Sequence, residues 1–202
     1  MSSIPSSIPP SEPGISHDAA DASPAVPAPR PVQGLHHFAW RCKDAEQTRV
    51  FYEDLLGLPL VHVIKNDHVP STGEYCPYVH LFFRMRDGSC IAFFDLGDDT
   101  AAEPSPNTPS WVNHIALRVD NPDDLRAMLA RMRAHGVDVI GTVDHDGYIL
   151  SIYCFDPNGL RVELTTEVAE PAVVQGFAQT AHAELAQWGQ EKAARRSAAS
   201  GG

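Results

Sequence analysis

The stretch HFAWR (residues 37–41) recurs as HIALR (residues 114–118), so His, Ala and Arg occupy the first, third and fifth positions of both copies. Side chains two residues apart lie on one face of a β-strand. The repeat therefore predicts two equivalent strands, each presenting a histidine, an alanine and an arginine on the same face.

The sequence after each copy is also repeated. Asp44, with Gln47 three residues later, begins a predicted helix that Gly57 ends, and Asn121-Pro122 begins a second helix that Gly136 ends. We expect three strands after each helix, at 58–64, 78–86 and 89–96 in the first copy and at 137–142, 148–155 and 161–165 in the second. The pattern predicts an α+β fold of two tandem βαβββ modules paired into one curved mixed sheet.

Composition predicts where this domain begins and ends. We expect a single domain over residues 33–168, with modules at 33–97 and 111–168 and a proline-rich linker at 98–110. Residues 1–32, rich in Ser, Pro and Ala, are expected to form a disordered arm. Residues 169–202 carry apolar residues at helical spacing, which predicts a C-terminal amphipathic helix with a frayed tail.

Charge and cysteine usage exclude several classes of protein. A formal net charge of -11 argues against a nucleic-acid partner, because phosphate binding requires clustered Lys and Arg. No apolar stretch is long enough to anchor the chain in a membrane. The four cysteines form no C-x-x-C pair and indicate reduced thiols, so we expect a cytoplasmic protein.

Three residues are candidate metal ligands. His37 and His114 stand at matched repeat positions and would face each other if the modules pair about a pseudo-twofold axis. Glu163 is an acid in an otherwise apolar strand, where a charge is costly unless it is paired or coordinated. A single strand histidine is usually structural, but the matched pair together with Glu163 favours one divalent metal ion bound by all three.

Three stretches carry a resemblance to a known family: HHFAWRCKDAEQTRVFYEDLLGLPL, WVNHIALRV and SIYCFDPNGLRVEL. Over about residues 35–167 the chain resembles the vicinal oxygen chelate superfamily. That superfamily includes glyoxalase I, methylmalonyl-CoA epimerase, fosfomycin thiol transferases, metal-free bleomycin-binding proteins and type I extradiol dioxygenases. The resemblance implies that the paired modules enclose a metal site.

The set of candidate metal ligands indicates which members of the superfamily this chain resembles most. Counted from the turn glycines, Ala92 mirrors Glu163, whereas glyoxalases and epimerases of this superfamily usually place a fourth ligand there. Two histidines and one carboxylate suit an Fe(II) oxygenase, with Mn(II) as the alternative metal. The pattern is most similar to one-domain type I extradiol dioxygenases, and the small Ala92 beside Phe93 and Phe94 leaves apolar space for O2.

The resemblance also implies roles for three further residues. Tyr153, ten residues before Glu163, stands where similar ring-cleaving enzymes keep a tyrosine that contacts the diol, and His145 lies in a loop near the site in many relatives. Such enzymes use an acid-base histidine at the place held here by Ser89 or Cys90, so His80 is our candidate substitute. We expect extradiol cleavage of a small aromatic diol by O2, with His80 or His145 accepting a proton. A homodimer is also expected.

Two alternatives remain open. A glyoxalase-like lyase or a fosfomycin-thiol-transferase-like enzyme would use the same metal ligands, and the latter class surrounds its anionic substrate with basic residues. The candidates for that role are Arg41, Arg84, Arg86, Arg118 and Arg161. A non-catalytic member that binds a small molecule is less well supported, because such proteins tend to lack the two histidines.

Overall fold

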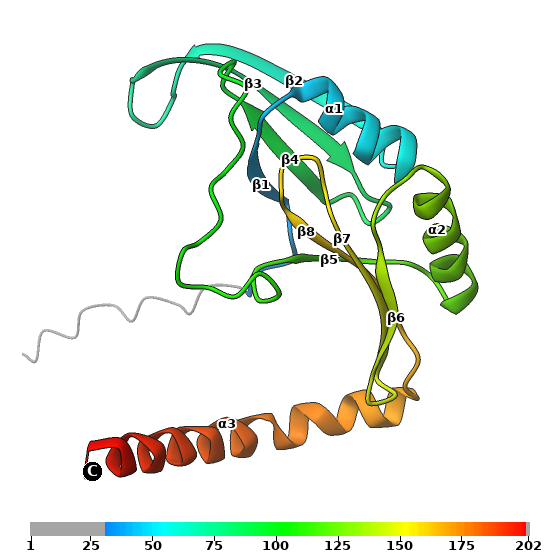
Figure 1. The fold of residues 1–202 in the computed structure, drawn as a ribbon, viewed down its shortest axis with the longest axis vertical. Helices are drawn as coiled ribbons and strands as arrows, with labels where there is room; N and C mark the ends of the chain where they lie inside the picture. Colours follow the sequence, from blue (N-terminus) through cyan, green and yellow to red (C-terminus); the bar gives the residue numbers. More distant parts are fainter. Residues whose placement is uncertain (1–30, 201–202) are drawn as a thin grey trace, which may run out of the picture. The chain divides into compact units, whose positions relative to one another are not determined.

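The first module forms one four-stranded sheet. A computed structural model describes residues 31–200, and from Leu35 onward the chain forms one unit. The elements of the first module are β1 (His37–Cys42), α1 (Ala45–Arg49), η1 (Val50–Leu55), β2 (Leu60–His68), β3 (Tyr75–Arg84) and β4 (Cys90–Asp95). The strand order is β1-β4-β3-β2, with β1 parallel to β4 and the other neighbours antiparallel (Figure 1).

The second module repeats this arrangement. Its elements are β5 (Ile115–Arg118), α2 (Pro122–Ala134), β6 (Ile140–His145), β7 (Ile149–Phe155) and β8 (Arg161–Glu167). The strand order is β5-β8-β7-β6, again with the first strand parallel to the last. The predicted α+β fold of tandem βαβββ modules is therefore confirmed, with hydrogen bonds grouping the eight strands as two sheets of four.

Local signals in the sequence set the helix ends. The Asp44 carboxylate accepts a hydrogen bond of 2.7 Å from Gln47 N, and the Asn121 side chain accepts bonds from the amides of Asp123 and Asp124. Gly57 and Gly136 follow the helices with φ of 77° and 78°, a conformation that glycine adopts without steric cost. The π-helical geometry of η1 was not predicted.

The strands differ from their predicted bounds mainly in the first hairpin and in β6. β6 was expected at 137–142 and runs Ile140–His145, so His145 ends a strand instead of lying in a loop. β2 continues to His68 and β3 begins at Tyr75, so pairing extends well beyond the apolar residues of each strand. This extension is built from polar residues around Lys65 and Asp67, and it depends on backbone pairing that an alternation pattern does not record. The predicted disordered arm covers residues 1–32, and residues 1–30 of it lie outside the described range.

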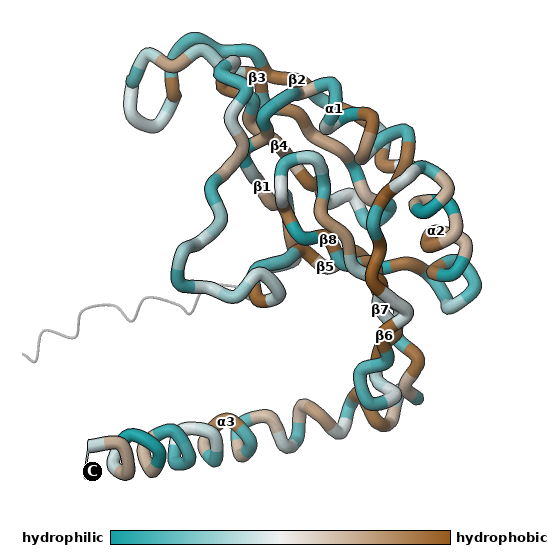
Figure 2. The backbone as a smooth tube through the Cα atoms, in the orientation of Figure 1, coloured by the Kyte–Doolittle hydropathy of each residue, from teal (hydrophilic) through white to brown (hydrophobic). Residues whose placement is uncertain are grey.

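The two modules share one hydrophobic core. Tyr52, Phe83 and Phe93 from the first module are fully buried, as are Met132 and Ile152 from the second. All five belong to a single hydrophobic cluster. Figure 2 shows hydrophobic stretches on strands of both sheets and on α1 and α2. Burial of this shared core stabilises the pairing of the modules.

A buried polar contact also joins the modules. Tyr52 donates a hydrogen bond of 2.9 Å from its hydroxyl to Asp156 Oδ2, and Asn158 Nδ2 donates to Thr48 Oγ1 at 3.1 Å. Burial raises the pKa of the Asp156 carboxyl, and hydrogen bonds from Leu160, Asn158 and Tyr52 offset part of that rise. The turn after β7 is thereby fixed against the first helix of the other module.

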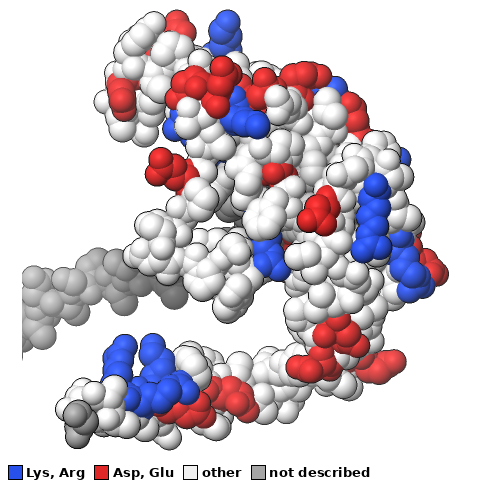
Figure 3. Space-filling view, in the orientation of Figure 1, with Lys and Arg blue, Asp and Glu red and all other residues white. Residues whose placement is uncertain are grey.

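The predicted C-terminal helix is present as α3 (Pro171–Ser200), but the expected amphipathic pattern is not, because its apolar residues do not gather on one face. Its side chains are not buried, and the Phe177 ring contacts the Tyr148 ring at a centroid distance of 5.2 Å. Figure 3 shows Lys and Arg gathered near the C-terminal end of α3, where Arg195 pairs with Glu191 at 4.0 Å. No helix in the described part of the chain is long and apolar enough to span a bilayer.

Candidate metal centre

Strand register supports the equivalence of Ala92 and Glu163. Ala39 of β1 pairs with Ala92 of β4, and Ala116 of β5 pairs with Glu163 of β8. Because Ala39 and Ala116 are the same position of the repeat, their partners also correspond. The first module therefore offers a buried methyl group where the second offers a carboxylate.

The second module brings His114 and Glu163 together. His114 directly precedes β5 and Glu163 lies within β8, and these strands are neighbours in the sheet. His114 Nε2 lies 3.0 Å from Glu163 Oε2. Glu163 is only 4% exposed, so its charge needs these close polar partners to offset the cost of burial.

The hydrogen bonds of His114 show which proton its ring carries. His114 Nδ1 lies 2.9 Å from the carbonyl oxygen of Val112, and a carbonyl only accepts, so Nδ1 carries a proton. In the neutral ring Nε2 then presents a lone pair toward the Glu163 carboxylate. A cation, either a proton or a metal ion, must lie between these two atoms. This tautomer is the one that metal-ligating histidines adopt, so the pair fits a divalent metal.

His37 begins β1, and its ring lies among aromatic side chains. Its centroid is 5.5 Å from the Phe82 ring and 6.0 Å from the His80 ring. His37 Nδ1 lies 2.7 Å from His36 Nδ1, which leaves His37 Nε2 for another partner. His36 thus contacts a candidate ligand directly.

The structure brings together two of the three predicted ligands. Among residues 31–200, no group of three His, Cys, Asp or Glu side chains lies close enough to hold one metal ion. His114 and Glu163 form a pair, and His37 is outside it. Three-ligand coordination therefore requires His37 to approach the pair when a metal binds, and it stays a prediction.

Tyr153 and His145 form a second pair beside His114. The Tyr153 hydroxyl lies 2.8 Å from His145 Nε2, and the Tyr153 ring is 6.4 Å from the His114 ring. The Arg161 guanidinium lies 4.5 Å over the Tyr153 ring. Burial raises the pKa of the Tyr153 hydroxyl, and the neighbouring Glu163 charge adds to that rise. Tyr153 is therefore held protonated and able to donate a hydrogen bond.

His80 occupies an apolar position on the first sheet. It pairs with Phe94 across the sheet, and its ring stacks on the Phe94 ring at a centroid distance of 3.7 Å. The side chain is 7% exposed, and Nε2 has no hydrogen-bond partner among the described residues. Burial lowers the pKa of His80 to about 4, with smaller contributions from His37 and His62. The ring is therefore neutral near pH 7.

Sequence reasoning overlooked Ser151. Ser151 pairs with Thr165 across the sheet, and its hydroxyl donates a hydrogen bond of 2.5 Å to Glu163 Oε1. A signal was available, because Ser151 interrupts an apolar strand and lies two residues before Tyr153, on the same face. Phe82, whose ring contacts that of His37, was not singled out from the sequence either.

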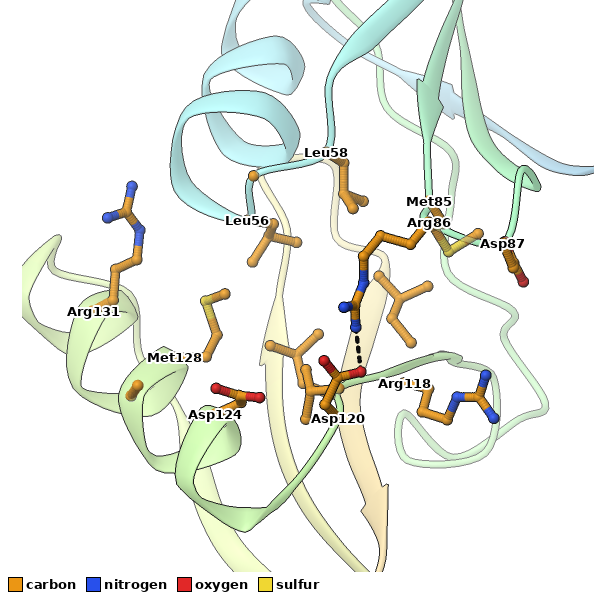
Figure 4. A pocket seen from close by; sticks show the side chains of 15 residues that line it. Leu56, Leu58, Met85, Arg86, Asp87, Arg118, Asp120, Asp124, Met128 and Arg131 are labelled. Atoms are coloured by element: carbon orange, nitrogen blue, oxygen red, sulfur yellow. Dashed lines mark hydrogen bonds and ion pairs between the residues drawn. The ribbon is translucent and has the colours of Figure 1, made fainter.

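A cavity lies on the opposite face of the second sheet. It has a volume of about 820 Å³ and includes Leu117 and Leu164, which neighbour Ala116 and Glu163 in sequence and so point away from them. Figure 4 shows Arg86 paired with Asp120 at this cavity, with Met128 of α2 nearby. None of the six predicted site residues lines it.

The fold defines a class of α+β proteins built from paired βαβββ modules. Residues 34–164 match the family model described as the Glyoxalase/Bleomycin resistance protein/Dioxygenase superfamily. Because the match covers more than half of the chain, the protein belongs to this superfamily. The resemblance identified from the repeat is confirmed.

Two similar curated proteins are dioxygenases by name. The chain is 26% identical over 169 residues to the biphenyl-2,3-diol 1,2-dioxygenase of Paraburkholderia xenovorans (strain LB400), covering 83% of this chain and 51% of that protein. It is 29% identical over 133 residues to the biphenyl-2,3-diol 1,2-dioxygenase of Metapseudomonas furukawaii, covering 65% and 39%. The chain thus spans about half, or less, of the length of these relatives.

Similar solved structures bear out the fold alone. A glyoxalase/dioxygenase from Nostoc punctiforme has a TM-score of 0.51 and 22% identity, covering 72% of this chain and 99% of that one. A mutant fosfomycin resistance protein from Listeria monocytogenes, solved with Mn(II) and a dihydroxypropylphosphonic acid, has a TM-score of 0.51 and 20% identity, covering 71% and 98%.

Proposed function

We propose that this protein is a metal-dependent extradiol dioxygenase that cleaves a catechol-type diol with O2. The observation that carries the proposal is the replacement of a fourth ligand by Ala92 at the position equivalent to Glu163. With His37, His114 and Glu163 as its only protein ligands, a bound metal would keep coordination positions open for the diol and O2. Two histidines and one carboxylate form the ligand set typical of non-heme Fe(II) oxygenases.

The names of the two curated relatives support the same reaction class. Both are biphenyl-2,3-diol 1,2-dioxygenases, and the alignment with the first covers 83% of this chain. A bound Fe(II) ion would supply acidity to the diol and an electron path to O2. Mn(II) is the alternative metal, and the diol itself is proposed only as a class.

The surroundings of the site suit a flat aromatic substrate. Phe82 and Phe94 lie beside His37 and His80, and Ala92 is fully buried at their sheet. These side chains would contact a substrate ring by aromatic packing and exclude water from it. The proposal places O2 beside Ala92, because a methyl group supplies no metal ligand at that position.

Three side chains would donate hydrogen bonds to the substrate or accept its protons. Tyr153, whose pKa is raised, would donate a hydrogen bond to a diol oxygen. His145 Nε2 lies 2.8 Å from the Tyr153 hydroxyl. It would accept a proton from the diol, either directly or relayed by that hydroxyl. His80, with Nε2 unpaired in the described structure, is the candidate base on the first sheet. In this proposal, Tyr153, His80 and His145 are the catalytic residues.

The test is anaerobic loading of purified protein with Fe(II), followed by O2 and a panel of catechol, 3-methylcatechol and 2,3-dihydroxybiphenyl. O2 uptake with a yellow ring-fission product is expected for at least one diol. The Tyr153→Phe variant should lose most of the turnover while it keeps bound iron. Metal-bound wild-type protein that consumes no O2 with any diol would end the proposal.

A further inference from the structure

Ser151 forms a hydrogen bond with one of the two carboxylate oxygens of Glu163. Its hydroxyl lies 2.5 Å from Glu163 Oε1, while Glu163 Oε2 faces His114 Nε2 at 3.0 Å. The two carboxylate oxygens therefore have different partners, one inside the sheet and one at the candidate metal centre.

The Ser151 hydroxyl has a single proton, and its neighbours decide where that proton points. Thr165 Oγ1 lies 3.0 Å from Ser151 Oγ, and it donates its own proton to the Leu150 carbonyl oxygen at 3.2 Å. A charged carboxylate at 2.5 Å is a stronger acceptor than a hydroxyl at 3.0 Å. Ser151 therefore donates to Glu163.

Water cannot replace this hydrogen bond. Ser151 is 0% exposed and Glu163 is 4% exposed, so removal of the hydroxyl leaves Oε1 buried without its donor. An unpaired buried carboxylate oxygen is costly. The Glu163 side chain would then be free to turn, and a divalent cation bound beside His114 would be the partner available to its second oxygen.

We propose that Ser151 is a positioning residue that restricts Glu163 to one-oxygen coordination. By occupying Oε1, Ser151 leaves Oε2 as the single donor that Glu163 offers to a divalent cation held with His114. This inference rests on the proposed function, because it requires that the His114 and Glu163 pair binds a metal. Hydrogen-bonding partners of metal ligands typically change metal affinity about 10–100-fold when they are removed.

The test measures metal binding in the absence of substrate. Metal-free wild-type protein and the Ser151→Ala variant are titrated with Mn(II) and with Co(II) against a chromogenic chelator. We expect the variant to bind Mn(II) about 10–100-fold more weakly. We also expect its Co(II) visible spectrum to change, because that spectrum reports coordination geometry and a Glu163 side chain released from Ser151 would no longer present Oε2 in one orientation.

The matched control is Tyr52→Phe. This variant also removes a buried hydroxyl that donates to a buried carboxylate, here Asp156, but it lies outside the metal centre. It should lose stability while its Mn(II) affinity and Co(II) spectrum stay those of the wild type. Ser151→Thr keeps a hydroxyl at the site and should restore most of the lost affinity.

The outcomes separate the two proposals. Wild-type protein that binds no divalent metal would overturn the proposed function itself. Wild-type protein that binds Mn(II), with Ser151→Ala within twofold of it and an unchanged Co(II) spectrum, would overturn the positioning role alone. If Ser151→Ala does not fold, Ser151→Cys, which keeps a small side chain with a weak donor, replaces it: reduced affinity supports the role and wild-type affinity rejects it.

Discussion

His114 Nε2 and Glu163 Oε2 lie 3.0 Å apart, on or beside two neighbouring parallel strands of the second sheet. His114 Nδ1 donates a hydrogen bond to the Val112 carbonyl, so either a proton or a metal ion must lie between the two side chains. The contact is the firmest structural basis for a metal centre in this chain.

Glu163→Gln should weaken metal binding by more than about 100-fold, because loss of a ligand exceeds the roughly 10–100-fold effect of losing a hydrogen-bonding partner. An amide carries no charge to balance a divalent cation. Isothermal titration of metal-free protein with Mn(II) measures the change. Glu167→Gln, at the exposed end of β8, is the matched control and should bind like the wild type.

Tyr52→Phe should lower the free energy of unfolding by about 1–2 kcal/mol, because it removes a buried hydrogen bond to Asp156 and leaves the carboxylate with fewer donors. Urea denaturation followed by tryptophan fluorescence provides the measurement. The same change at Tyr75, which is 69% exposed, should alter stability by less than about 0.5 kcal/mol. Equal effects at the two positions would contradict the assigned contact between modules.

The four cysteines should differ sharply in reactivity. Burial raises the pKa of Cys42 to about 11 and that of Cys154 to about 12, so at pH 8 only about one Cys42 thiol in a thousand is ionised. Cys90 is buried and Cys76 is half-buried. A disulfide reagent should modify Cys76 first in the native protein and all four thiols after denaturation. A fast phase that survives in Cys76→Ser would show that another thiol is accessible.

Gly141→Ala should destabilise the second sheet by roughly 2–4 kcal/mol. A Cβ atom at Gly141 would lie 2.8 Å from Ile152 Cγ2 and 3.0 Å from Ile152 Cα, and φ is +144°. Thermal unfolding midpoints of the two proteins would reveal the loss. Gly34→Ala, where no heavy atom lies within 4 Å of the added Cβ, is the control and should melt with the wild type.

Much of the fold was predictable because its signals are local or repeated. The helix caps at Asp44 and Asn121 and the stop at Gly57 and Gly136 depend on residues within a few positions of each other. The length of β2 was not predictable, since its polar half is held by pairing with β3 rather than by burial. Likewise, no sequence pattern indicated the π-helical turn of η1.

The sequence by itself determined the duplicated modules, the family, and the choice of His114, Glu163 and Tyr153 as residues of interest, because repetition and alternation are properties of a linear chain. Only the tertiary structure decided that His114 and Glu163 meet, that His37 stays outside that pair, and that Ser151 holds the second oxygen of Glu163. Those relationships depend on which strands become neighbours and on side-chain orientation within the sheet, and both are set when the two modules pack together.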